Sequence, residues 1–187
     1  MSCDLPFLFR LEEICVIEAT ADRGIRLVQL RQIVVFISKM ATSWYETHGS
    51  NAGAQLTAET VNLYHAKFWL IKPATEGYRS GQGCSLVEAM AVSVDAQTPS
   101  WFEPIRKFER CLKQHAQVRE LASHTSYWVC AYANNQHAVG EDIVNNPRCT
   151  SFYQAMQKCQ GVLLILDKDG TPFERIWCCF EETIVVD

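Results

Sequence analysis

The chain has 187 residues, of which 48% are hydrophobic and 20% are charged, and its formal net charge is −4 at pH 7. This length and composition allow a sizeable core, which excludes a protein that is disordered throughout. The 17 lysine and arginine residues are scattered, whereas a nucleic-acid surface needs clustered positive charge, so we expect no nucleic-acid partner. No run reaches the roughly 18 apolar residues of a membrane span, and the short apolar run at 6–9 lacks a signal-peptide pattern. We therefore expect a cytoplasmic protein that does not bind a membrane.

Residues 1–53 are predicted to form a mainly helical N-terminal extension. Between residues 22 and 48 the apolar side chains recur at spacings of three and four, which indicates a helix. The Ile-Val-Val run at residues 33–35 would also suit a strand, because β-branched residues favour strands. The small-residue loop at residues 49–53 is the predicted boundary with a second domain, residues 54–187.

The second domain is predicted to begin with an aromatic-rich segment and a short helix. Residues 61–71 hold closely spaced aromatic and aliphatic side chains, which suggests a packing surface. His65 lies in this segment, and such a histidine is more often a hydrogen-bonded core or surface residue than a ligand. Ser85 and Glu88 have the spacing of a capping box, which predicts a helix that begins beside Ser85.

The rest of the second domain shows alternating strand and helix patterns. Residues 100–102 are expected to begin a first strand, and Pro104 to begin a helix with an apolar inner face. Residues 162–166 are five consecutive apolar residues between a glycine and a charged turn, which is typical of a parallel strand covered on both faces. We predict that this strand lies parallel to residues 127–132, with the helix at 151–159 forming a right-handed crossover between them.

A final helix is predicted from Thr171, because Thr171, Pro172 and Glu174 have the pattern of a capped helix start. In a parallel sheet the ligand lies at the carboxyl ends of the strands. Glu181 would lie about 15 Å along a helix that begins at Thr171, which is too far from that edge. A functional Glu181 therefore requires the regular helix to begin nearer Arg175.

Two amides follow the predicted strand at 127–132. Asn134 and Asn135 open a polar loop at its carboxyl end. Amides at this position can hydrogen-bond a ribose or a base, although polar loops are also common without any ligand.

The nine cysteines are an odd number and several lie in apolar runs. This pattern fits reduced thiols that serve as small core residues. Zinc is an alternative, because Cys130, His137, Cys149 and Cys159 fall in one region. The sequence has no Cys-x-x-Cys pair and no His-x3-His spacing, so we expect no metal.

A strand followed by the Trp-Cys-x-x-Glu motif at 177–181 resembles the Toll/interleukin receptor-like (TIR) domain. The Gly-Glu-Asp-Ile loop at 140–143 and the helix at 151–159 are similar to elements of that family in the same order. The resemblance covers about residues 100–182 and implies an α/β fold, a partial TIR-like (flavodoxin-like) parallel sheet with flanking helices. In catalytic TIR domains the motif's glutamate is used to cleave NAD. The resemblance therefore implies Glu181 as the catalytic residue and Trp177 as a residue that shapes the pocket, with NAD as a substrate and no bound cofactor.

The chain also looks like a member of a large protist family of the dinoflagellate type, which has no assigned activity. This resemblance covers about residues 60–187. It is carried by the sequence runs 62–65, 71–75, 84–88, 127–136 and 175–182. In that family the first strand continues into a Ser-His-Trp-Trp-Gly segment before a Glu-Pro pair, whereas here Phe102 is joined directly to Glu103 and Pro104. We therefore expect a defective or rebuilt ligand pocket.

Three function classes remain open. The expected one is a TIR-like protein-interaction or signalling module without full catalytic activity, whose partner is a second copy of the chain or another protein. Arg175 stands where the TIR family often has serine, which favours this class. The alternatives are an NAD-cleaving hydrolase that uses Glu181 and a truncated, inactive copy, since a complete TIR domain would add two more strands.

Overall fold

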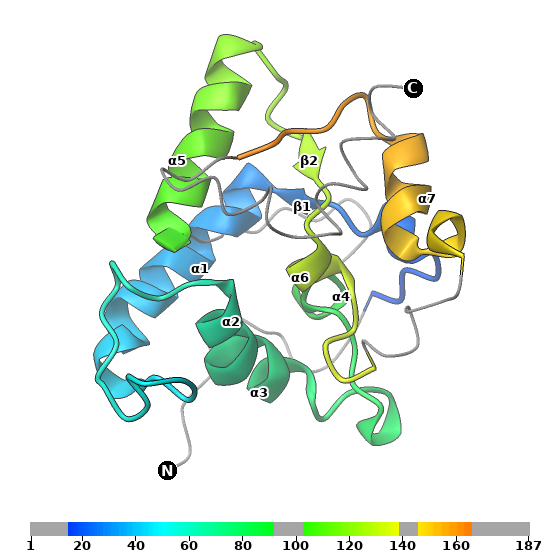
Figure 1. Cartoon of the computed structure of the whole chain (residues 1–187). Helices are drawn as coiled ribbons and strands as arrows, with labels where there is room; N and C mark the ends of the chain where they lie inside the picture. Colours follow the sequence, from blue (N-terminus) through cyan, green and yellow to red (C-terminus); the bar gives the residue numbers. More distant parts are fainter. Residues whose placement is uncertain (1–14, 92–102, 139–145, 166–187) are drawn as a thin grey trace.

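The computed structural model of the chain describes residues 15–91, 103–138 and 146–165 (Figure 1). This part of the chain is mainly helical and contains one sheet of two strands. The helices are α1 (Leu27–Met40), α2 (Leu63–Ala66), α3 (Lys72–Thr75), α4 (Leu86–Met90), α5 (Glu103–Val118), α6 (Cys130–Ala133) and α7 (Ser151–Lys158). The strands are β1 (Ile25–Arg26) and β2 (Ser126–Tyr127). Single 3-10 turns cover Thr20–Asp22, Ala41–Ser43, Arg79–Gly81 and Pro147–Cys149, and a π-helical turn, Lys67–Ile71, joins α2 to α3.

Helix α1 confirms the helix predicted between residues 22 and 48. Leu30, Ile33 and Ile37 repeat at three and four residues and are fully buried, because this spacing places them on one face. The β-branched run at 33–35 is helical, and its last member, Val35, is exposed. Burial of one apolar face therefore outweighs the strand preference of the β-branched side chains.

Helix α5 packs along α1 (Figure 1). It buries Leu112 and partly buries Phe108, while Arg110 and Lys113 lie on its exposed face. The predicted amphipathic helix is confirmed. The pairing of α1 and α5 builds one half of the core, and the helices α2 to α4 cover the other.

The core joins side chains from before and after the 49–53 loop. The rings of Trp44 and Trp69 stack with their centroids 6.3 Å apart, and the Trp69 indole donates a hydrogen bond to the Tyr45 carbonyl at 2.9 Å. The division of the chain after residue 53 stays a prediction, because two domains can share such an interface.

A buried ion pair connects three separate parts of the chain. Arg23 Nη2 lies 3.3 Å from Glu88 Oε1, and both side chains are less than a tenth exposed. The Arg23 guanidinium also donates to the carbonyls of Ile17 and Ala133. Glu88 accepts from the Ser85 hydroxyl at 2.9 Å and completes the predicted capping box of α4. The N-terminal segment, α4 and α6 therefore meet at one pair of charges.

The segment before α1 also reaches residues much later in the chain. The Trp128 indole donates to the Thr20 carbonyl at 2.9 Å, and Lys158 Nζ lies 2.6 Å from Asp22. Strand β1 pairs with β2 in the same region. Residues 20–26 therefore lie against β2 and α7.

The predicted parallel sheet is wrong for the described part of the chain. The sheet there is antiparallel and has two strands, with Ile25 opposite Tyr127 and Arg26 opposite Ser126. Tyr127 thus lies in a strand, as predicted, but it is the last residue of β2, and residues Cys130–Ala133 form α6. Alanine favours helix and disfavours strand, and this run contains two alanines.

Residues 161–165 are neither helix nor paired strand in the structure. The strand predicted at residues 127–132 ends at Tyr127 and is followed by α6. Residues 161–165 therefore have no neighbouring strand there with which to form backbone hydrogen bonds. Val162, Leu163 and Leu164 are 43%, 39% and 41% exposed, which overturns the prediction of a strand covered on both faces. The helix expected between the two strands is confirmed as α7.

Several sequence predictions fall outside the described residues. They are the first strand at 100–102, the loop at 140–143 and the helix expected from Thr171.

The described cysteines form no disulfide with one another, and the prediction of reduced thiols stays a prediction. The prediction that most are buried is wrong for this part of the chain, where only Cys84 is buried. Cys130 begins α6 instead of lying inside a strand, so its side chain is exposed. Cys149 and Cys159 are also exposed. No helix in the described ranges is long and apolar enough to cross a membrane.

The buried ion pair predicts a large loss of stability when one partner is removed. We expect Glu88→Ala to lower the free energy of unfolding by about 3–5 kcal/mol, because it leaves the Arg23 charge buried and unpaired. Arg31→Ala is the control, since it removes a more exposed pair with Glu109 at 3.5 Å and should cost less than about 1 kcal/mol. Urea unfolding of the two variants and the wild type measures both. Equal losses would contradict the role assigned to the buried pair.

Candidate functional site

The two amides predicted to bind a ligand, Asn134 and Asn135, form hydrogen bonds within the protein. Asn134 Oδ1 accepts from the Ser151 hydroxyl at 3.1 Å, which connects the end of α6 to the start of α7. Asn135 donates to the carbonyls of Gln82 and Gly83 at 3.1 and 3.4 Å and accepts from the His137 amide at 3.0 Å. Both amides therefore hold loops together in this structure.

His137 explains why these loops come so close. Its Nε2 lies 2.9 Å from the Thr75 hydroxyl, which itself donates to the Ile71 carbonyl. Gly83 has a φ of +71° and faces the His137 ring so closely that a Cβ would collide with it. A residue other than glycine at position 83 would therefore separate the two loops.

Glu181 and Trp177, the predicted catalytic and pocket residues, lie outside the described part of the chain. The parallel sheet that would have placed Glu181 beside Asn134 and Asn135 is absent from the described residues. NAD cleavage by Glu181 stays a prediction from the sequence.

The described residues hold no group of three or more His, Cys, Asp or Glu side chains that could bind a metal ion. This includes the four residues weighed as zinc ligands, Cys130, His137, Cys149 and Cys159. In the structure His137 bonds to Thr75 instead.

A groove of about 1020 Å³ lies between α5, β2 and α7. In Figure 1 the segment 161–165 runs as an extended trace from α7 toward α5 across β2. This segment contributes Val162, Leu163 and Ile165 to the lining. The other apolar lining residues include Phe108 and Leu112 of α5, Tyr127 and Val129 in and after β2, and Phe152 and Met156 of α7.

Two pairs of polar groups in the groove bond to each other. The Tyr127 hydroxyl lies 3.0 Å from His115 Nδ1 and 3.4 Å from the Leu112 carbonyl. Partial burial raises the pKa of Tyr127 above its ordinary value, which keeps the hydroxyl protonated. Lys158 pairs with Asp22 at the rim. The groove thus presents mainly apolar surface, with Arg119, His124 and Gln160 among its other polar lining residues.

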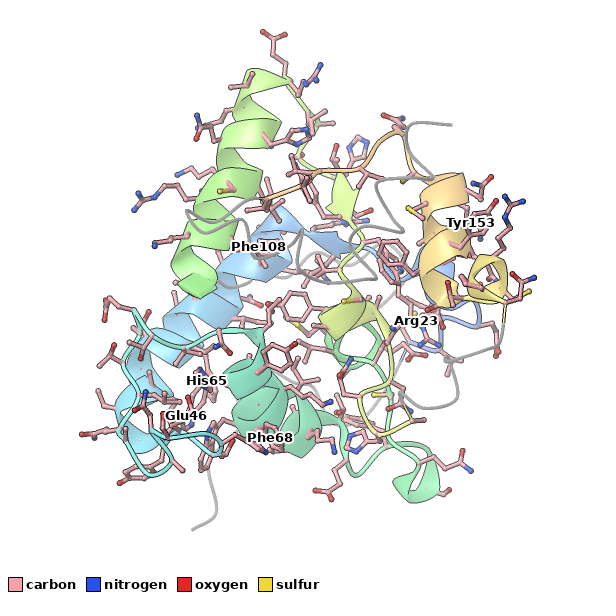
Figure 2. The ribbon with its side chains drawn as sticks, in the orientation of Figure 1. Arg23, Glu46, His65, Phe68, Phe108 and Tyr153 are labelled. Carbon is pink, nitrogen blue, oxygen red and sulfur yellow. The ribbon has the colours of Figure 1, made fainter. Side chains whose placement is uncertain are left out.

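A second, smaller pocket of about 350 Å³ lies beside α2, in the loop after α1. His65 and Glu46 point toward each other there (Figure 2), with His65 Nε2 2.8 Å from Glu46 Oε2. His65 Nδ1 accepts from the Asn62 backbone amide at 3.1 Å, so the ring proton sits on Nε2 and is donated to Glu46. Both ring nitrogens are occupied, which agrees with the prediction of a hydrogen-bonded histidine and leaves no nitrogen for general-base catalysis.

The sequence analysis missed Glu46 as the partner of His65. Asn62 and His65 do carry a local signal, because they have the spacing of a capping box with histidine in place of glutamate. The approach of Glu46 depends on the turn at residues 46–54, and 19 residues separate it from His65.

Comparison with protein-family models, with curated proteins and with solved structures finds no match in any of the three. The function must therefore be inferred from the geometry of the chain itself.

Asn135 provides a test between a structural and a ligand-binding role. We expect Asn135→Ala to lower the free energy of unfolding by about 1–2 kcal/mol, because it removes hydrogen bonds to residues 82, 83 and 137. Asn51→Ala, on the exposed 49–53 turn, should change it by less than about 0.5 kcal/mol. Chemical denaturation measures both. Unchanged stability together with loss of NAD binding would restore the ligand-binding interpretation.

Glu46 provides a prediction for the pH dependence of stability. Its hydrogen bond from His65 and those from the Thr47 and His48 amides hold the pKa of the Glu46 carboxyl below its ordinary value of 4.5. A carboxyl whose pKa is lowered in the folded protein stabilises it above the ordinary value, and this stabilisation is lost as the pH falls through the lowered pKa. We therefore expect Glu46→Gln to be less stable than the wild type at pH 7, with the difference shrinking as the pH falls below 4.5. Thermal unfolding across this range measures it, and a difference that does not depend on pH would contradict it.

Proposed function

We propose that the chain is a protein-interaction module that binds a second copy of itself through the groove and the segment at residues 161–165. The observation that supports this most directly is the exposure of three consecutive aliphatic side chains, Val162, Leu163 and Leu164, at the edge of an apolar groove. The proposal keeps the interaction role expected from the sequence and does not use the TIR fold.

The exposed segment is suited to pairing with an identical segment. It runs as an extended trace (Figure 1), and the described residues provide no strand that pairs with it. Unpaired backbone of this kind can add to a strand of another chain. Two copies related by a twofold axis would place their 161–165 segments antiparallel, which completes a ladder that neither copy has alone.

The groove makes the same surface self-complementary. Each copy presents both projecting aliphatic side chains and a concave apolar lining that includes Phe108 and Met156. A twofold contact brings the same patch of two molecules together, so a surface that carries both shapes can close as a dimer.

The energies favour a weak dimer. Full burial of a valine or leucine side chain contributes about 1.5–3 kcal/mol, so completing the burial of a side chain that is two-fifths exposed contributes about 1 kcal/mol. Six such side chains, three from each copy, contribute about 6 kcal/mol, which is close to the lower end of the association cost of about 4–15 kcal/mol. Burial of the groove and the backbone hydrogen bonds must supply the remainder. We therefore expect an equilibrium between monomer and dimer that depends on concentration.

Leu163→Asp tests this proposal, because it would place a charge in the dimer contact on both copies. We expect the wild type to sediment as a reversible monomer and dimer, and the variant to need at least about tenfold higher concentration to dimerise. Val35→Asp is the matched control, because it makes the same kind of change at an exposed position on α1 away from the groove.

Sedimentation velocity over a wide concentration range distinguishes the outcomes. Leu164→Asp, a substitution at another exposed position of the same segment, should weaken the dimer as Leu163→Asp does. A wild type that stays monomeric at every concentration, or one that forms particles of indefinite size, would overturn the proposal. Dimerisation of Leu163→Asp at wild-type concentration would also overturn it.

A further inference from the structure

The pocket beside α2 combines one carboxylate with aromatic rings. Figure 2 shows Glu46, His65 and Phe68 in this region, with Glu46 in the loop after α1 and His65 and Phe68 on the helical segment that begins with α2. Tyr64 and the His48 ring complete the aromatic part of the lining. The volume of about 350 Å³ is enough for a small organic group.

The charge in this pocket comes from Glu46. Its Oε2 accepts from His65, and its Oε1 accepts from the Thr47 and His48 backbone amides at 3.0 and 3.3 Å. These three contacts hold the carboxylate in place and ionised. They do not supply a full positive charge, because the hydrogen-bonding pattern of His65 is that of a neutral ring. Among the residues that the structure describes, no lysine or arginine lines the pocket. The lining therefore carries a net negative charge.

The aromatic side chains of the pocket are partly exposed to solvent. The His48 and Phe68 rings lie 5.1 Å apart at an angle of 41°, and the Phe68 and Tyr64 side chains are 41% and 62% exposed. The Thr47 hydroxyl lies 2.6 Å from His48 Nδ1, which orients the ring next to Phe68. The faces of Phe and Tyr rings attract cations.

We propose that this pocket binds an alkylammonium group, with the Glu46 carboxylate supplying the opposite charge and the rings of Phe68 and Tyr64 contacting its alkyl substituents. The negative lining disfavours an anion. Among the described residues the pocket lacks the three ligands that a metal ion would need. An alkylammonium group matches both the charge and the apolar faces. This proposal is independent of the self-association proposed for the groove, because the two surfaces share no lining residue.

Choline and its neutral isostere 3,3-dimethylbutan-1-ol provide the primary test, since they have nearly the same shape and differ in charge. We expect choline to shift the amide resonances of residues 46–48 and 64–68 in a saturable way in an NMR titration. The neutral isostere should bind at least about fivefold more weakly. Equal binding of the two molecules, or no saturable shift with choline, would overturn the proposal.

Three variants assign the binding to this pocket. Glu46→Gln keeps the shape and removes the charge, and Phe68→Leu keeps apolar bulk and removes the ring. We expect each to weaken choline binding by at least about fivefold. Glu76→Gln removes an exposed carboxylate outside the pocket and should leave binding unchanged. Because Phe68 is exposed, Phe68→Leu is expected to fold even if Glu46→Gln does not. Unchanged binding in a folded Phe68→Leu variant would overturn the assignment.

Two sources of an alkylammonium group can be separated in the same titration. One is a free small amine such as choline, and the other is a methylated lysine side chain in a peptide. A short acetylated peptide that contains trimethyllysine should bind more tightly than choline if the pocket recognises a protein segment. It should bind no more tightly than choline if the pocket recognises a free amine. A control peptide carries alanine in place of the trimethyllysine. Binding of this control would show contacts outside the pocket and would contradict recognition through the ammonium group.

Discussion

The ion pair between Arg23 and Glu88 is the contact on which the rest of the described structure depends. It lies where three segments meet that have little secondary structure of their own: the N-terminal segment, the single turn α6 and the five-residue helix α4. Helices this short are not stable alone. Their backbone groups are satisfied instead by the two charges, since Arg23 donates to the carbonyls of Ile17 and Ala133. The pair thus replaces the regular hydrogen bonds that a larger sheet would have provided.

Helices with local signals could be predicted from the sequence, and the sheet could not. The apolar repeat of α1, the amphipathic pattern of α5 and the Ser85 and Glu88 capping box are each contained within one element. The run at 127–133 is apolar and short, and such runs do not distinguish a strand from a helical turn. Its outcome was decided by β1, about a hundred residues earlier, which provides only two residues for pairing. The error at 162–166 followed, because a strand is buried only if a neighbouring strand covers it.

For the candidate surfaces too, features within one element could be predicted from the sequence, whereas contacts between distant elements could not. Asn134 and Asn135 were selected because they follow an apparent strand, but in the structure their amides serve Ser151 and the Gln82–Gly83 backbone. The pocket at Glu46 forms where a turn contacts a one-turn helix. No sequence motif predicts this contact. The pocket follows the C-terminal end of α1, and the groove is lined by Asp22 and Gly24, which precede the N-terminal end of α1. A helix of 14 residues is about 21 Å long, so each surface can be occupied without direct contact between the ligands.

The contacts of residues 20–26 have a consequence for how the chain folds. The hydrogen bond between Trp128 and Thr20 spans 108 residues, and the bond between Lys158 and Asp22 spans 136. Closing loops of this length costs entropy before any contact is gained, which slows folding. On the ribosome, α1 can begin to form as it emerges, whereas the segment in front of α1 cannot make its contact between Asp22 and Lys158 until α7 has been synthesised. Glu88 and Ala133 emerge before α7, so Arg23 gains its two partners in chain order, and the contact with Lys158 completes the docking of the segment at residues 20–26 last.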